Sequence, residues 1–204
     1  MAPLQLFLSL FPIGILVVLS TKILHMLFTS NEAGTSQAFP EFEHLATAMS
    51  VRLAPGRGYV VTRIPTVART NPMRRQITLD RKVFFALAPE ERLALVAHEL
   101  AHLRRHHSVY AVLIASGGSV VALLLLPSPW PVLSVPAWVI GISGMLIFRR
   151  LSEYQADLLA AKFVDPQRLA SALMKLSKER RSRVANLTHP SPSQRVAKLT
   201  RGTR

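Results

Sequence analysis

Three long stretches of the chain consist almost entirely of apolar residues. They cover residues 3–28, about 110–126 and about 132–148, and Lys22 is the one Asp, Glu, Lys or Arg within them. A helix needs about 20 apolar residues to cross a hydrocarbon core of about 30 Å. The pattern therefore predicts about three transmembrane helices, with an anchor at residues 1–28 and a hairpin at residues 109–148.

The first stretch also has the length of a signal peptide. No basic residue precedes its apolar part, and no clear small-residue cleavage site lies near its end. A signal peptide carries both features. We therefore interpret residues 1–28 as a retained N-terminal transmembrane anchor.

The segments outside these stretches carry short strand and helix patterns. Two runs rich in β-branched residues, residues 59–64 and 75–79, are predicted to pair as a small antiparallel sheet, with a turn at Asn71-Pro72 between them. From Pro89 onward apolar residues recur at spacings of three and four, which predicts a helix that continues through His107 into the second apolar stretch. Further helices are predicted at residues 42–51, 149–164, 167–178 and 193–199. The fold class is therefore mainly α with a small β-sheet (α+β).

The charges are strongly basic and unevenly placed. The chain has 25 Lys and Arg against 11 Asp and Glu, and every Lys and Arg except Lys22 lies in residues 52–105 or 149–204. Cytoplasmic flanks of membrane helices are enriched in Lys and Arg, so both basic segments are expected in the cytoplasm, with the N-terminus and the turn at residues 128–131 outside. Orientation and attraction to the lipid bilayer explain the surplus, and we expect no nucleic-acid partner.

The sequence VAHELAHLRRHH, residues 96–107, contains the pattern H-E-x-x-H. On a helix His98 and His102 share one face, where two imidazoles can bind one zinc, and Glu99 can act as general base toward a water. The alternative is a solvated helix face that carries these residues by chance. Because the chain has no cysteine, His and carboxylate are the ligands open to a metal.

A catalytic zinc needs a third protein ligand. One extended form of the motif places Gly six residues and His ten residues after the first His, but Arg104 and Ser108 stand there. His106 lies about 6 Å farther along a straight helix than His102, so we interpret His106 and His107 as interfacial residues near the lipid headgroups.

The second helix offers a better candidate in the sequence LSEYQAD. Glu153 can supply the third ligand, and Asp157, one turn later, can accept the N–H of a ligating imidazole and so fix its tautomer. The alternative is an exposed acidic pair. Three of the 11 acidic residues fall in these two short motifs, which favours the metal site.

The chain resembles the membrane zinc metallopeptidases of HtpX type, gluzincins that are related to the CaaX prenyl proteases. The resemblance covers roughly residues 41–199 and rests on HELAH (His98–His102), on ExxxD (Glu153–Asp157) and on HPSPSQR (His189–Arg195). It implies a zincin-like catalytic domain and an endopeptidase that binds one Zn²⁺ per chain. Glu99 would be the base and Glu153 the third ligand, and His189 and Arg195 would stabilise the oxyanion.

Two features depart from that family. It usually has two spans before the catalytic helix, whereas one is expected here, and the segment ARTNPMRR stands where an Asn-Ala-Phe-like strand usually binds the peptide. The domains expected are the anchor (1–28), a first catalytic part (29–108), the hairpin (109–148) and a second catalytic part (149–204).

The expected function is hydrolysis of polypeptides in or near a membrane, in protein quality control at the bacterial inner membrane. One alternative is a catalytically inactive membrane scaffold or signalling protein that keeps zinc for stability. A sensor peptidase is a second alternative, but the turn at residues 128–131 is too short for a sensor domain. Imidazole and carboxylate also accept other divalent ions.

Overall fold

The computed structural model describes residues 35–36, 39–55, 58–64, 66–128, 130–179 and 189–202. The predicted anchor at residues 1–28 lies outside them. The chain divides into two units: the first comprises Met1–Asn31 and Val109–Phe148, and the second comprises Glu32–Ser108 and Arg149–Arg204.

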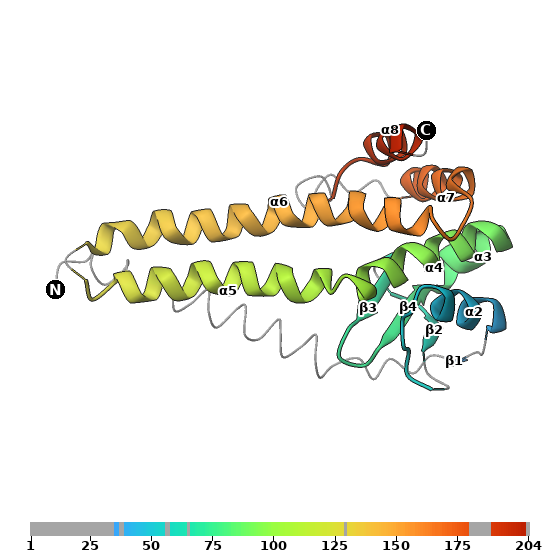
Figure 1. The fold of residues 1–204 in the computed structure, drawn as a ribbon, viewed down its shortest axis with the longest axis horizontal. Helices are drawn as coiled ribbons and strands as arrows, with labels where there is room; N and C mark the ends of the chain where they lie inside the picture. The colour runs from blue at the N-terminus through green and yellow to red at the C-terminus, as the bar shows by residue number, and fades with distance from the viewer. Residues whose placement is uncertain are drawn as a thin grey trace. The chain divides into compact units, whose positions relative to one another are not determined.

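Helices dominate the described part of the chain, and one small sheet accompanies them (Figure 1). In chain order the elements are β1 (Thr35–Ser36), α2 (Pro40–Ala48), β2 (Tyr59–Thr62), β3 (Ala68–Asn71), β4 (Gln76–Asp80), α3 (Arg81–Ala86), α4 (Pro89–Arg104), α5 (His107–Leu125), the 3-10 turn η1 (Pro131–Leu133), α6 (Ser134–Ala160), α7 (Pro166–Glu179) and α8 (Pro192–Gly202). The expected fold class, mainly α with a small sheet, is confirmed.

In the first unit, α5 and the first part of α6 lie side by side (Figure 1). Both helices are long and apolar enough to cross a membrane, and only 22% of the most apolar part of α5 and 6% of that of α6 is buried. The core helix of a soluble protein is mostly buried instead, whereas here Leu124 and Ile140 are each 70% exposed. Two apolar, exposed helices are suited to association with a membrane.

Two glycines allow these helices to approach closely. A methyl group added at Gly118 would lie 2.5 Å from Cα of Gly141, and one added at Gly141 would lie 2.6 Å from Cα of Gly118. Glycine removes the Cβ atom that would keep the backbones apart. The two helices therefore pack closely at this pair.

The sheet of the second unit has the strand order β1-β2-β4-β3. β2 and β4 pair in parallel, and β3 pairs with β4 antiparallel. The expectation that the runs at residues 59–64 and 75–79 would pair antiparallel was wrong. The chain between them forms its own strand, β3, which folds back on β4.

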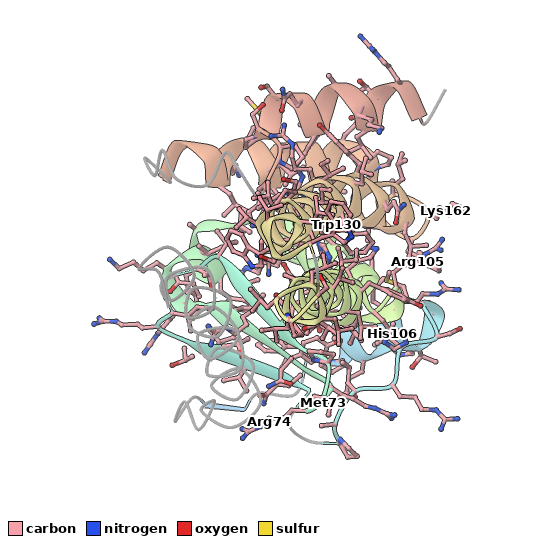
Figure 2. The ribbon with its side chains drawn as sticks, turned by 90° about the vertical axis from the view of Figure 1, so that its left-hand side faces the viewer. Met73, Arg74, Arg105, His106, Trp130 and Lys162 are labelled. Atoms are coloured by element: carbon pink, nitrogen blue, oxygen red, sulfur yellow. The ribbon has the colours of Figure 1, made fainter. Side chains whose placement is uncertain are left out.

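The turn between β3 and β4 explains this topology. The side-chain oxygen of Asn71 accepts hydrogen bonds from the backbone N–H groups of Met73 (3.1 Å) and Arg74 (3.0 Å). Arg75 then adopts a φ of 49°, which reverses the chain. Met73 and Arg74 lie at the tip of this hairpin (Figure 2). The turn expected at Asn71-Pro72 is present, but it joins adjacent strands.

The helix that carries HELAH, α4, begins as expected and ends earlier than expected. Pro89 is its first residue. It ends at Arg104, and His106 has a φ of 52°, so the expected continuation through His107 was wrong. The N–H groups of Arg105 and His106 donate to the carbonyls of Ala101 and Leu103, and the left-handed residue then directs the chain into α5.

The core of the second unit surrounds α4. This helix contacts α7, α2 and the edge strand β3, and α7 in turn contacts α8. Its fully buried apolar residues are Ala94, Val96, Ala97, Leu100 and Ala101. The central position of α4 leaves little freedom to the polar side chains that it presents to its neighbours.

A buried carboxylate, Glu91, fixes the start of α4 against α7. Its two oxygens accept hydrogen bonds from the Ser171 hydroxyl (2.7 Å) and the Lys175 ammonium (2.8 Å), and the N–H of Ala88 also donates to it (2.9 Å). Burial raises the pKa of Glu91, but the bonds from Lys175, Ser171 and Ala88 outweigh burial and lower the pKa to about 2. The ionised carboxylate therefore stabilises the fold.

We expect Glu91→Gln to lower the free energy of unfolding by about 1–3 kcal/mol, because it removes a buried charged acceptor from three donors. The pKa of Glu91 is lowered on folding, so its contribution is fully present above about pH 4.5 and is lost as the pH falls toward 2. Thermal unfolding in detergent at several pH values measures this. The control is Glu90→Gln, an exposed neighbour in the same helical turn; equal effects of the two variants at neutral pH would contradict the assignment.

Gly118→Val is expected to destabilise the first unit by about 1–3 kcal/mol, because the added side chain overlaps the backbone at Gly141 and forces the helices apart. Gly117→Val is the matched control, since a Cβ at Gly117 meets no atom within 4 Å. Thermal unfolding in detergent compares the two. Two equal losses would show that helix propensity, and not close packing, sets the result.

Candidate metal centre

The two histidines of HELAH lie on one face of α4 and point to a common place. The Nε2 atoms of His98 and His102 are 3.1 Å apart, and the rings meet edge to face with centroids 4.7 Å apart. Positions four apart on a helix are stacked one turn above the other. His98 is buried and His102 is partly buried.

Glu153 of α6 reaches the same place from a segment about 50 residues farther along the chain. Its Oε2 lies 3.5 Å from Nε2 of His98, and its Oε1 lies 3.6 Å from Nε2 of His102. The glutamate is only 6% exposed. The structure thus brings together the three side chains that the sequence offered as ligands, and all their ligand atoms lie within 4.8 Å of one another.

These distances fit a tetrahedral metal ion. Ligand atoms about 2.0–2.1 Å from a zinc at tetrahedral angles are separated from each other by about 3.3 Å. The two imidazole nitrogens are 3.1 Å apart, and each has a different oxygen of Glu153 near it, Oε2 at 3.5 Å from His98 and Oε1 at 3.6 Å from His102. The donors, two imidazole nitrogens and one carboxylate, also match the chemistry of zinc sites without thiolates. The residues present therefore fit a zinc ion.

Asp157 lies one turn after Glu153 and behind His98. Its Oδ1 is 2.9 Å from Nδ1 of His98, and the side chain is 2% exposed. This contact occupies the ring nitrogen that faces away from Nε2. It orients the imidazole so that Nε2 is directed at the other candidate ligands.

Arg195 of α8 contacts the carboxylates of both Glu153 and Asp157. Its Nε donates to Oδ2 of Asp157 (2.8 Å) and its Nη2 donates to Oδ1 (2.6 Å), while Nη1 lies 2.9 Å from Oε2 of Glu153. The Arg195 side chain is 11% exposed. A bidentate arginine–carboxylate pair of this kind has a fixed geometry as well as a favourable energy.

His189, just before α8, approaches from the solvent side. Its Nδ1 lies 2.9 Å from Oε1 of Glu153, and the side chain is 46% exposed. The HPSPSQR segment therefore contributes both of its candidate residues to the surroundings of Glu153. Residues of all three motifs, HELAH, ExxxD and HPSPSQR, are therefore in contact around Glu153 and Asp157.

Glu99 follows His98 directly and is partly buried. Burial, together with the negative charge of Glu153, raises the pKa of its carboxyl, and the positive charges of His98 and Arg195 oppose that rise. A raised pKa makes a carboxylate a stronger base, which is the property that a proton acceptor needs.

The two candidate ligand histidines differ in their protonation. Burial and Arg195 lower the pKa of His98, but its contacts with Asp157 and Glu153 outweigh them and raise the pKa to about 9. Burial and the charge of His98 lower the pKa of His102 to about 3. A metal ligand must be neutral imidazole, so an ion that binds here displaces a proton from His98.

One residue at the site was assigned elsewhere by the sequence. His107, expected at the lipid headgroups with His106, is instead only 4% exposed, and its Nδ1 lies 2.9 Å from Nδ1 of His102. The expectation assumed a continuous helix, in which His107 would not meet His102. His106 is exposed and lies near Arg105 at the edge of the unit (Figure 2).

Comparison with known proteins agrees with this geometry. Residues 41–203 match the model of peptidase family M48. The fold is similar to the crystal structure of S. mikatae Ste24p, with a TM-score of 0.63 and 17% sequence identity over 95% of this chain, which spans 58% of the length of that chain. The family expected from the three motifs is therefore confirmed: the match extends over most of the chain, and the chain belongs to peptidase family M48.

Proposed function

We propose that the protein is a membrane-bound zinc endopeptidase that hydrolyses polypeptides in or near the membrane. The observation that carries this proposal is the convergence of His98, His102 and Glu153 at the separations of a tetrahedral site, with Glu99 beside them. Membership of family M48 and the fold similarity to Ste24p support it.

His98, His102 and Glu153 would hold the ion, which would supply Lewis-acid chemistry by polarising a peptide carbonyl and making water more acidic. Glu99 takes the proton of the attacking water and passes it to the leaving amine. Glu99 follows His98 directly, so both residues lie in the same turn of α4. The partly buried position of Glu99, which raises its pKa, suits both transfers.

Asp157 and Arg195 both contact the candidate ligands. Asp157 orients His98, and Arg195 fixes Asp157 and Glu153 together. The expected oxyanion role of Arg195 stays a prediction, to which these contacts add a positioning role. His189 is the more accessible of the pair and suits the oxyanion role, because about half of its side chain remains exposed beside Glu153.

The position of the site along the chain favours substrates close to a membrane. His98 precedes the start of α5 by nine residues. Glu153 follows the last residue of the apolar unit, Phe148, by five residues. We propose a cytoplasmic orientation in a bacterial inner membrane on the basis of the Lys and Arg distribution. The resemblance to HtpX-type enzymes is the basis on which we propose a role in quality control.

Zinc content tests the ligand set. We expect about one zinc per chain in the parent and a large loss in His98→Ala and in Glu153→Ala, because each change leaves two ligands. Metal analysis of the full chain purified in detergent measures it, with thermal unfolding as the check on folding. His44→Ala, on the exposed side of α2, is the control. A full zinc complement in folded Glu153→Ala would remove Glu153 from the ligand set.

Glu99→Gln separates catalysis from metal binding. We expect the variant to keep its zinc and to lose at least about 100-fold in cleavage rate, because the amide cannot accept a proton. Cleavage of a fluorescently labelled unfolded protein in detergent micelles measures the rate. Glu90→Gln, at the start of the same helix, should cleave like the parent.

The same pair of variants tests the alternative of an inactive zinc-stabilised scaffold or signalling protein. That alternative requires zinc in the parent and no cleavage by any of the three proteins. Undiminished cleavage by Glu99→Gln would instead show that Glu99 is not the base.

A further inference from the structure

We infer that His107 is a positioning residue that holds His102 in the orientation needed for metal binding. The inference rests on the proposed metal site. It starts from one contact, between Nδ1 of His107 and Nδ1 of His102, at 2.9 Å. The two rings meet edge to face, with centroids 4.9 Å apart and planes inclined at 78°. His107 is 4% exposed, so this contact is shielded from water.

The ring nitrogens assign a direction to this hydrogen bond. His102 presents Nε2 to His98 and Glu153, so Nε2 is the nitrogen that would bind the ion. A neutral imidazole that binds a metal through Nε2 carries its proton on Nδ1. That N–H donates to Nδ1 of His107, which acts as the acceptor. The contact therefore selects both the tautomer and the ring orientation of His102.

The break between α4 and α5 creates the contact. Successive residues of an α-helix are about 100° apart around the axis, so a residue five positions on would lie about 140° away from His102. His106 interrupts the helix with a φ of 52°, and α5 begins with His107 turned toward α4. A positive φ is costly in most residues other than glycine. The positive φ of His106 thus allows His107 to reach His102.

His107 matches the part that Asp157 plays for the other histidine. The nitrogen of His98 that faces away from the candidate ligands meets Oδ1 of Asp157 at 2.9 Å, and the equivalent nitrogen of His102 meets His107 at the same distance. In both His98 and His102, Nε2 faces the other candidate ligands and Nδ1 contacts a supporting side chain. The two supports differ in charge, since Asp157 is an anion and His107 accepts as neutral imidazole.

Zinc affinity tests the role without reference to turnover. In the Glu99→Gln background, which prevents self-cleavage, we expect His107→Leu to weaken zinc binding by about 10- to 100-fold, the usual effect of removing such a support. His107→Asn should restore most of the affinity, because its Oδ1 takes the place of Nδ1 as acceptor. Competition with a zinc chelator on the full chain in detergent gives the affinities. Cobalt(II) in place of zinc gives a visible spectrum that is expected to change in the Leu variant alone.

His106→Asn is the matched control. It removes the neighbouring exposed imidazole and keeps a residue that tolerates a positive φ, so its zinc affinity should equal that of the parent. Thermal unfolding of the metal-free proteins checks the fold, and His107→Ala replaces His107→Leu if the latter does not fold.

Parent-like affinity in His107→Leu, or equal losses in the His107→Leu and His107→Asn variants, would overturn the inference. If the parent binds no zinc, the proposed metal site fails first; if the parent binds zinc tightly and these variants do so equally, only the role of His107 fails.

Discussion

Two buried carboxylates one helical turn apart constrain the whole second unit. Glu153 and Asp157 are 6% and 2% exposed. Burying an ionised carboxylate costs several kcal/mol unless a partner of opposite charge and hydrogen bonds compensate it. α6 alone supplies neither to these two positions. The compensation comes from His98 on α4 and from Arg195 on α8, so the three helices must meet in one arrangement for the charges to be satisfied.

This constraint explains why the motifs are so far apart in the sequence. Residues 109–148 separate HELAH from Glu153 and Asp157, and α7 lies between this acidic pair and Arg195 in the chain. Apolar packing of α4 against α7 and of α7 against α8 brings the segments near each other, but it does not set ring or carboxylate orientations. The bidentate contact of Arg195 with Asp157 does, because a planar guanidinium accepts only a narrow range of positions for its partner.

The sequence predicted the elements and motifs well because periodicity and ligand spacing are local properties. HELAH on a helix, an acidic pair one turn apart and a mainly α fold all follow from residues within a few positions of each other. The failures concern features decided by tertiary contacts. The parallel pairing of β2 with β4 depends on the hairpin that Asn71 closes, and no local pattern distinguishes it from an antiparallel pair. The break at His106 was missed because no glycine or proline marks it, and with it the burial of His107 was missed.

The charges around the candidate metal centre are consistent with a divalent ion. Glu99, Glu153 and Asp157 are three carboxylates, and the guanidinium of Arg195 is the permanent cation that contacts two of them. With neutral imidazoles, two negative charges remain, and a dication balances them. This balance also gives a reason for an imidazole, and not a second carboxylate, behind His102. A further anion there would leave the buried cluster with an excess negative charge when zinc is bound, whereas His107 orients the ligand and adds none.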